Sequence, residues 1–141
     1  MKISQLSIFM ENRVGVVNEV TTILSNAGIS MRAFSLSDGI EFGILRLIVD
    51  NPEEAKDVMQ EAGFKVSLTD VLCVQVPNVA GGLSGLLDCL AKGEVFIQYM
   101  YAFSEGDVAS TVIRPNNMER CIELLNENRE VLMKKSELYN F

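Results

Sequence analysis

The pattern of hydrophobic positions changes period in the same order in both halves of the chain. Near the start, the apolar run Leu6–Met10 is typical of a β-strand and breaks at a short polar segment. Apolar residues then recur at helical spacing and predict a helix closed by Gly28: Val16, Val17, Val20, Ile23, Leu24 and Ala27. After the apolar run Leu72–Val76, the same change predicts a helix that ends near Gly93, with the apolar face Leu83, Leu86, Leu87 and Leu90.

The first half continues with a hairpin, a second helix and a last strand. The β-type runs Ile29–Leu36 and Phe42–Val49 are joined by Ser37–Gly39, whose residue types are typical of a turn. Asn51, followed by a proline and then by a glutamate at the third helical position, predicts the N-cap of a helix that ends at Gly63. The face of this helix and the strand after it consist of Ala55, Val58, Met59 and Ala62, then Phe64, Val66 and Leu68.

The second half repeats this order of elements. Val95–Phe103 alternates as a strand, Ser104–Asp107 is predicted to turn the chain, and Val108–Arg114 returns it. Asn116, with a glutamate three residues later, predicts the N-cap of a helix, and Val131–Leu138 is predicted as a last strand. In this region the offset between the two copies is predicted to fall to about 63 positions, as a shorter second hairpin would require.

Matching residues recur 66 positions apart in the earlier parts of the two halves. Asn12 and Gly15 match Asn78 and Gly81. Such a repeat predicts two domains, residues 1–70 and 71–141. Each is read as strand–helix–strand–strand–helix–strand, so we predict an α+β fold of two tandem ferredoxin-like βαββαβ units, with antiparallel sheets and the helices on one face. A unit this small buries only about 60% of its unfolded surface, so we expect a shared interface or an oligomer.

The composition limits the classes of function. Hydrophobic residues make up 48% of the sequence, as in a globular and not a disordered protein. The net charge of −7 and the lack of a basic stripe disfavour nucleic-acid binding. The apolar runs are only strand-length, and the first residues lead straight into a strand without the features of a signal peptide. We therefore expect a cytoplasmic protein with no nucleic-acid and no membrane partner.

Few groups in the chain are suited to catalysis. Histidine is absent, so Ser-His and Cys-His nucleophile pairs and histidine metal ligands cannot be built. Cys73, Cys89 and Cys121 form no CxxC pair, and we interpret them as small buried hydrophobes and not as a metal or redox site. The acidic segment Glu53–Glu61 is interpreted as a solvated face, and Gly81–Gly85 lacks the lysine of a phosphate-binding loop. We predict no enzyme activity, no metal and no cofactor.

The strand–helix junction in each half predicts a site for a small anion. Gly15 can take backbone angles closed to other residues, and the N–H groups from Val14 to Val17 would be unpaired donors at the positive end of a helix. A carboxylate there would gain charge-assisted hydrogen bonds. Asn12 could offer its amide oxygen to a ligand ammonium or its amino group to the carboxylate. The structural alternative is that Asn12 caps the helix and Gly15 makes a tight turn.

The segment Ile8–Val17, followed by a helix and then by Gly28–Met31, resembles the opening of an ACT domain. ACT domains are small ferredoxin-like regulatory modules that bind amino acids and related ligands. Family members often have Asn-Arg-Pro-Gly at this loop, where this chain has Val14 in place of the proline and Ala80 at the equivalent position. The resemblance covers nearly the whole chain as two tandem ACT units.

The resemblance implies a ligand site between the first strand–helix loop of one unit and the second strand of its neighbour. The implied ligand-binding residues are Asn12, Arg13, Val14, Gly15, Val16, Phe34, Ser35, Asn78, Val79, Ala80, Gly81, Gly82, Tyr99 and Met100. For the strand segments 33–35 and 99–101, plain sheet packing is the alternative interpretation. Arg13 could pair with an acidic ligand group or be a solvated loop arginine.

The implied function is that of a non-enzymatic regulatory protein that senses a free amino acid. Its expected partners are the amino acid itself and either further copies of the chain or a partner enzyme or regulator. Two other functions stay open. The first is a regulatory subunit or interaction module of an amino-acid biosynthetic enzyme, with no ligand of its own. The second is a catalytic ferredoxin-like domain such as an acylphosphatase, which would need a phosphate-binding loop with an arginine that neither loop resembles.

Overall fold

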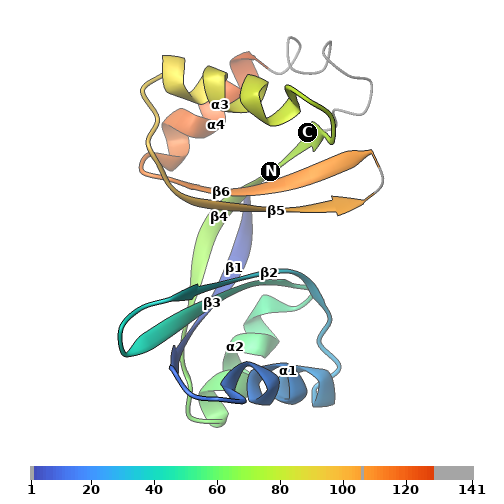
Figure 1. The fold of residues 1–141 in the computed structure, drawn as a ribbon, viewed down its shortest axis with the longest axis vertical. Helices are drawn as coiled ribbons and strands as arrows, with labels where there is room; N and C mark the ends of the chain where they lie inside the picture. The colour runs from blue at the N-terminus through green and yellow to red at the C-terminus, as the bar shows by residue number, and fades with distance from the viewer. Residues whose placement is uncertain (1, 106, 129–141) are drawn as a thin grey trace. The chain divides into compact units, whose positions relative to one another are not determined.

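A computed structural model describes residues 2–105 and 107–128, and this part of the chain forms six strands and four helices (Figure 1). Along the sequence they are β1 (Lys2–Glu11), α1 (Val16–Asn26), β2 (Met31–Asp38), β3 (Phe42–Val49), α2 (Pro52–Glu61), β4 (Lys65–Pro77), α3 (Gly82–Lys92), β5 (Ile97–Glu105), β6 (Val108–Pro115) and α4 (Met118–Glu127). The contacts divide the chain into two compact units. One is Ser4–Asp70, and the other contains the residues from Val71 onward together with the start of β1.

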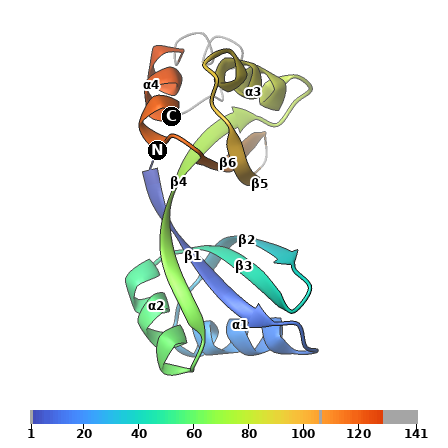
Figure 2. The same ribbon diagram turned by 90° about the vertical axis from the view of Figure 1, so that its left-hand side faces the viewer.

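The first unit has the predicted βαββαβ order, and its strands pair antiparallel. Strand β3 lies between β1 and β2, with Leu47 opposite both Leu6 of β1 and Phe34 of β2. Helices α1 and α2 cover the same face of these strands (Figures 1 and 2). The alternating apolar positions of the strands and the apolar stripes of the helices meet in one core: Leu6, Ile8, Met10, Val16, Val20, Leu24, Ile29, Leu45, Leu47, Val49, Ala55 and Met59.

The second unit repeats this order as far as its last helix. Strand β6 pairs antiparallel with both β4 and β5, and α3 and α4 cover one face of these strands (Figure 2). Its core consists of Leu72, Val74, Val76, Leu86, Leu90, Val95, Ile113, Cys121, Leu124 and Leu125. The predicted last strand, Val131–Leu138, lies outside the described residues. The predicted α+β ferredoxin-like architecture is confirmed.

The offset between the two copies stays at 66 positions throughout, so the predicted drop to about 63 is wrong. Helix α1 begins at Val16 and α3 at Gly82, β3 begins at Phe42 and β6 at Val108, and α2 and α4 also begin 66 positions apart. The second hairpin is not shorter than the first. Its turn has one residue fewer, but β5 ends one residue later than the position equivalent to the end of β2, so the two differences cancel.

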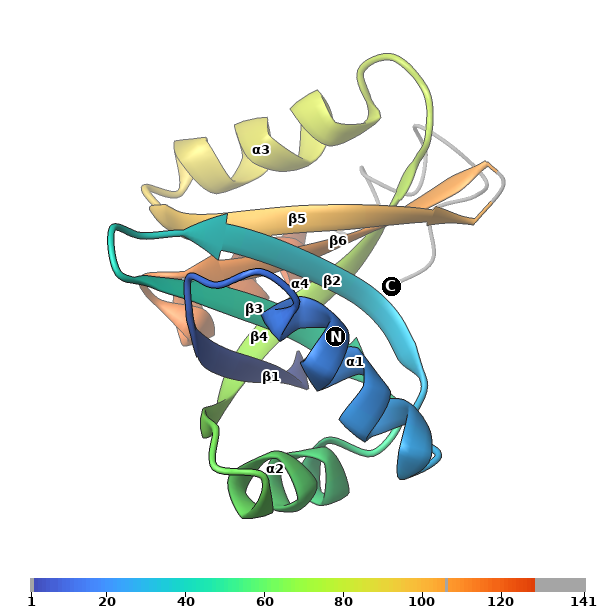
Figure 3. The same ribbon diagram turned by 60° about the horizontal axis from the view of Figure 1, so that its bottom comes forward.

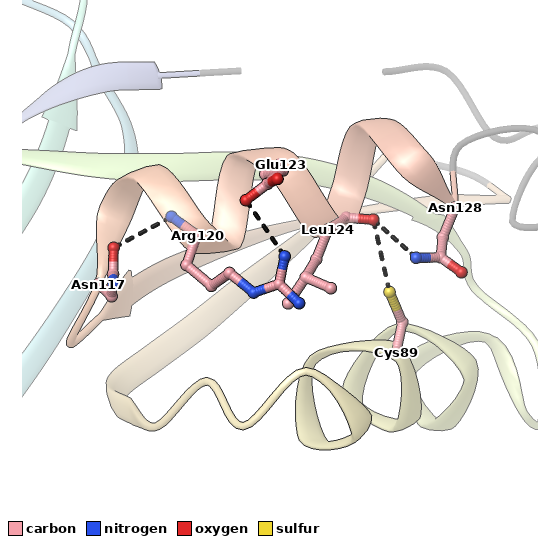
Figure 4. A network of polar contacts seen from close by, with 6 residues as sticks. All are labelled: Cys89, Asn117, Arg120, Glu123, Leu124 and Asn128. Carbon is pink, nitrogen blue, oxygen red and sulfur yellow. Dashed lines mark hydrogen bonds and ion pairs between the residues drawn. The ribbon is translucent and has the colours of Figure 1, made fainter.

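The N-cap of α4 is Asn117 and not the predicted Asn116. Asn117 accepts a hydrogen bond from the backbone N–H of Arg120 at 3.0 Å (Figure 4). Asn116 instead accepts from the backbone N–H of Phe96 at 3.0 Å, so its side chain holds the start of β5 to the end of β6. The glutamate three residues later favours Asn116 by the capping rule, and tertiary contacts override this preference. The predicted N-cap Asn51 is confirmed, because its side chain accepts from the N–H of Glu54.

The strands extend further than their hydrophobic patterns. The two predicted strands Phe64–Leu68 and Leu72–Val76 are one continuous strand, β4, which belongs to both units. The hydrogen-bonded order is β2-β3-β1-β4 in the first unit and β4-β6-β5 in the second. Ser37 and Asp38 were predicted in a turn, but they pair with Ile44 and Gly43 of β3. Strand β2 therefore continues past its last apolar residue, Leu36.

Candidate functional site

The loop between β1 and α1 is shaped by a glycine with a positive φ angle. The chain leaves β1, turns through this loop and enters α1 at its N-terminus (Figure 3). Gly15 is the N-cap of α1 with φ 86° and ψ −3°, and no side chain caps the helix. Gly81 has nearly the same angles, φ 87° and ψ −9°, at the N-cap of α3. The expected special backbone angle of Gly15 is confirmed, and it explains why glycine stands at both junctions.

The first turn of α1 offers backbone donors that the described part of the protein leaves unpaired. The N–H groups of Val14, Gly15 and Val17 donate no hydrogen bond to any of these residues. The prediction is wrong for Val16, whose N–H donates to the carbonyl oxygen of Arg13 at 3.4 Å. Unpaired N–H groups at a helix N-terminus carry the positive end of the helix dipole, which favours an anion at this position.

Asn12 holds the loop to the hairpin and does not cap the helix, so the structural alternative for this residue is wrong. Its Nδ2 donates to the carbonyl oxygen of Gly39 at 2.7 Å and to that of Ile40 at 3.4 Å. Its backbone N–H donates to the carbonyl oxygen of Glu41 at 3.2 Å. A Cβ atom at Gly43 would lie 3.2 Å from Asn12 Oδ1, so this glycine leaves room for the amide. Because Nδ2 is engaged, the oxygen is the part of the amide that a ligand can use.

Arg13 forms an ion pair at the edge of the loop. Its guanidinium donates to the carboxylate of Glu19 at 2.6 Å, and the two side chains are 48% and 45% exposed. The hydrogen bond to Glu19 and then its charge raise the pKa of Arg13, with a smaller contribution from Glu11. Arg13 is thus neither isolated in solvent nor a free cation for a ligand.

A shallow cavity of about 400 Å³, open to solvent, lies against this loop, and we call it the loop cavity. It is lined by Met10, Glu11, Asn12, Arg13, Val14, Val16, Val17 and Leu36. Four of the predicted ligand-binding residues are therefore brought together around one space. The residue pattern did not single out Leu36, although its place in the alternation of β2, two positions after Phe34, would have indicated the same face of the strand.

The predicted residues on β2 do not line the loop cavity. Phe34 lies on an edge strand and is 71% exposed, so sheet packing does not account for its side chain. It pairs with Leu47, whereas Ser35 pairs with Arg46, so the two residues project from opposite faces of the sheet. Their participation in a ligand site stays a prediction.

The loop between β4 and α3 has a similar backbone conformation to the first loop, with one closer backbone contact. The N–H of Asn78 donates to the carbonyl oxygen of Asp107 at 2.7 Å. This bond is equivalent to the one from the N–H of Asn12 to Glu41 in the first unit. A Cβ atom at Gly82 would collide with the carbonyl oxygen of Pro77, so only glycine fits at the start of α3. Val79 is 62% exposed and Ala80 is also exposed.

The chemistry of the two loops differs although their backbones match. The positions equivalent to Arg13 and Glu19 are Val79 and Gly85, so the second loop has no corresponding ion pair. Tyr99 and Met100, the predicted strand residues of the second unit, pair with Arg114 and Ile113 on β6, and Met100 is 38% exposed. The first loop therefore presents charged groups and the second an apolar and glycine-rich surface.

The remaining candidate groups form no catalytic or metal site within residues 2–105 and 107–128. No cluster of three or more Cys, Asp or Glu side chains there could hold a metal ion. Burial raises the pKa of Cys73, Cys89 and Cys121, and that of the buried Cys121 reaches about 11. Thiols with raised pKa values are poor nucleophiles at neutral pH. No helix in the same part of the chain is both long and apolar enough to cross a membrane.

Comparison with known structures places the fold. A Bacteroides thetaiotaomicron protein of known crystal structure is 43% identical, with a TM-score of 0.88, and the match covers 92% of this chain and 90% of that one. The regulatory subunit of aspartate kinase from Thermus thermophilus is 14% identical over 88% of this chain and 91% of that one, with a TM-score of 0.67. The corresponding subunit from Thermus flavus is 15% identical over 90% and 94%, with a TM-score of 0.64. These two subunits share the fold alone.

The family assignment rests on the sequence as well. No curated protein sequence matches the chain significantly. Residues 1–141 match the family model described as an ACT domain pair. The Asn-x-x-Gly loop, its repeat after 66 positions and the βαββαβ order of the first unit agree with this match. The chain therefore belongs to the ACT domain family, as a pair of ACT domains.

Proposed function

We propose that this protein is a non-enzymatic regulator that binds a free amino acid at its β1–α1 loop. The observation that carries the proposal is the juxtaposition, in one loop, of unpaired first-turn N–H groups and a cavity of about 400 Å³. That volume lies within the range of about 300–1,000 Å³ typical of small-molecule pockets. A free amino acid is small enough for the cavity and carries the carboxylate that helix N–H groups favour.

The polar groups of the loop match the two ends of an amino acid. The carboxylate is proposed to accept from the N–H groups of Val14 and Val17, which line the loop cavity where no side chain caps the helix. The ammonium is proposed to lie near Asn12 Oδ1 or the carboxylate of Glu11, which also lines the loop cavity. The side chain of the ligand would then contact the apolar part of the lining, which includes Leu36.

The regulatory output is proposed to pass through a partner protein. An amino acid that binds one arrangement of the loop better than another shifts the population toward that arrangement, and a partner can respond to the shift. The aspartate kinase regulatory subunits share only the fold with this chain, so the partner enzyme is not assigned from them. Use of the equivalent loop around Asn78 and Gly81 as a second ligand site is part of the proposal.

A second candidate function is a protein-interaction module with no ligand of its own, and the edge strand β2 favours it. Phe34 and Leu36 on this strand are 71% and 56% exposed, and the nearby loop residues Val14 and Ile40 are fully exposed. Exposed apolar side chains along an unpaired strand edge are typical of surfaces that bind another protein. This function would not require the unpaired N–H groups of the loop.

Thermal unfolding against the full panel of free amino acids tests the proposal. A ligand at about 100 times its dissociation constant adds about 2.7 kcal/mol of stability, which is several degrees for a protein of this size. We expect a shift with one or two amino acids only. The variants Asn12→Ala and Asn78→Ala, made separately, should each reduce the shift if both loops bind, whereas Asn26→Ala at the exposed end of α1 should not.

The outcomes separate the two functions. A shift with a few amino acids that Asn12→Ala reduces supports ligand binding at the first loop. A flat panel at millimolar concentrations, together with a stable complex on affinity purification, would favour the interaction module. A shift that neither asparagine variant changes would show that the ligand binds elsewhere.

A further inference from the structure

A second and larger cavity, of about 520 Å³, lies in the unit Ser4–Asp70. We call it the Phe9 cavity. It gathers residues from the end of β1, the start of α1, the start of β3, the connection between α2 and β4, and the start of β4. Its lining is Phe9, Glu11, Arg13, Val16, Glu19, Phe42, Ala62, Gly63, Phe64 and Lys65. The Phe9 cavity shares Glu11, Arg13 and Val16 with the loop cavity, whereas Asn12, Val14 and Leu36 line the loop cavity alone.

Three phenylalanines form the aromatic part of the lining of the Phe9 cavity. Phe9 is only partly buried, although its neighbours Ile8 and Met10 belong to the core. Phe64 packs partly against the core, and Phe42 is 54% exposed. Aromatic side chains left open around a concave space offer flat apolar contacts to a ligand ring.

One cation in this cavity has no acidic partner among the described residues. The ammonium of Lys65 lies 5.6 Å from the centroid of the Phe9 ring, within the range of a cation–π contact, and it forms no ion pair there. Arg13, the other cation of the lining, is already paired with Glu19. A ligand carboxylate would therefore be attracted to Lys65. The carboxylates of Glu11 and Glu19 in the same lining would repel a second negative charge on the ligand.

The chemistry of the Phe9 cavity belongs to one copy of the repeat. Since the elements of the two units are related by a constant offset of 66 positions, the equivalent residues can be identified from the sequence. The fold does not require the aromatic and charged residues that line the Phe9 cavity, because the second unit lacks them at the equivalent positions. The positions equivalent to Phe9, Arg13, Glu19 and Phe42 hold Gln75, Val79, Gly85 and Val108.

We propose that the Phe9 cavity is a second ligand site that binds a small monocarboxylate carrying an aromatic ring. The carboxylate pairs with the ammonium of Lys65, and the ring packs against Phe9 and Phe64. Such a ligand needs no ammonium group, which distinguishes it from the amino acid proposed for the loop cavity. Because Glu11, Arg13 and Val16 line both cavities, occupation of one site can alter the other.

Phenylacetate is a suitable probe, since it combines one carboxylate with one ring. A molecule of this size is expected to bind with a dissociation constant on the order of 1 mM. Titration into the isotope-labelled full chain should shift the backbone amide signals of Phe9, Phe64 and Lys65 in NMR spectra. Phenylacetamide, which lacks the charge, and acetate, which lacks the ring, should each bind more weakly.

The variant Lys65→Met removes the ammonium and keeps an unbranched apolar stem. It should weaken phenylacetate binding about tenfold, the effect of losing one charge-assisted contact. Lys92→Met is the matched control, because Lys92 is 77% exposed, pairs with Asp88 and lies in the other unit. It should leave the dissociation constant unchanged.

Three results would overturn the proposal: no shift at the lining residues, equal binding of phenylacetate and phenylacetamide, or equal effects of the two lysine variants. The readout residues Phe9, Phe64 and Lys65 line the Phe9 cavity and not the loop cavity, so their shifts report on this site. A flat amino-acid panel with specific phenylacetate shifts would remove the loop proposal alone. Amino-acid binding without phenylacetate binding would remove only the proposal for the Phe9 cavity.

Discussion

The side chain of Asn12 binds the β1–α1 loop to Gly39 in the β2–β3 hairpin, through a hydrogen bond of 2.7 Å from Nδ2 to the carbonyl oxygen. The backbone N–H of Asn12 donates to the carbonyl oxygen of Glu41 in the same hairpin. The asparagine thus positions the loop from the outside, while Gly15 provides its turn. A structural role and a ligand role are compatible for this residue, because its amide oxygen is not used in the contact to Gly39.

The variant Asn12→Ala should lower the free energy of unfolding by about 0.5–1.5 kcal/mol, as expected for the loss of a partly exposed side-chain hydrogen bond. Urea unfolding measures this difference, with Asn26→Ala as the control at an exposed site without a side-chain bond. In NMR spectra the backbone amides of residues 39–41 should also shift. If stability falls while these amides keep their positions, the contact to the hairpin is not the cause.

Much of the fold could be predicted from the sequence because burial imposes a strict period on each element. The apolar stripe of α1 and the alternation of β3 indicated their faces correctly, and Leu24 and Leu45 are buried as this spacing requires. The backbone role of Gly15 before α1 and Gly81 before α3 was also predictable. An Asn-x-x-Gly junction repeated after 66 positions indicates one shared backbone conformation.

The parts that could not be predicted depend on contacts distant in the sequence. Local rules favoured Asn116 over Asn117 as the cap of α4, because the bond from Phe96 that engages the Asn116 side chain joins residues 20 positions apart. The hydrophobic pattern ended at Leu68 and resumed at Leu72, although β4 is continuous between them. The Phe9 cavity was missed for the same reason, since its lining comes from the ends of four elements.

The first residue of α3 should not tolerate any side chain. A Cβ atom at Gly82 would collide with the carbonyl oxygen of Pro77, which is backbone and cannot rotate away. We expect Gly82→Ala to destabilise the protein by about 1–3 kcal/mol or more, as overpacking does in a buried site. Urea unfolding of Gly82→Ala beside Ser84→Ala, an exposed position two residues later, tests this. Equal stability of the two variants would contradict the close approach.

The residue after the C-cap of α3 should be improved by glycine. Glu94 has φ 60°, and the equivalent residue after α1 is Gly28 with φ 73°. A left-handed conformation costs a residue with a Cβ atom about 1–2 kcal/mol, and the greater flexibility of glycine in the unfolded chain offsets part of this. Glu94→Gly should therefore stabilise the protein by about 0.5–1 kcal/mol.

Chemical unfolding measures this gain, and Glu94→Ala is the matched control. Alanine removes the same charge but keeps a Cβ atom in the left-handed conformation, so it should give little change. If alanine stabilises as much as glycine does, the cause is the charge of Glu94 and not its backbone angle. Gly28→Ala should show the reverse effect in the first unit, since it introduces the strain that Glu94 now carries.

The stability of the protein should fall in alkaline solution because of Cys121. Burial, and to a smaller extent the nearby Cys89, raises the pKa of Cys121 from 9.0 to about 11. Between these two values the unfolded chain loses the thiol proton while the folded chain retains it, so the free energy of unfolding decreases as pH rises. The contribution is complete below pH 9.0 and is lost as pH approaches about 11.

Urea unfolding of Cys121→Ala across this pH range tests the assignment. The variant should be less stable at neutral pH, because it leaves a cavity in the core of the second unit, but its stability should decline less steeply with pH. Leu125→Ala is the control, since it also leaves a cavity in the core of the second unit but removes no titratable group. An equal decline in the wild-type protein and in Cys121→Ala would assign the alkaline loss to other groups.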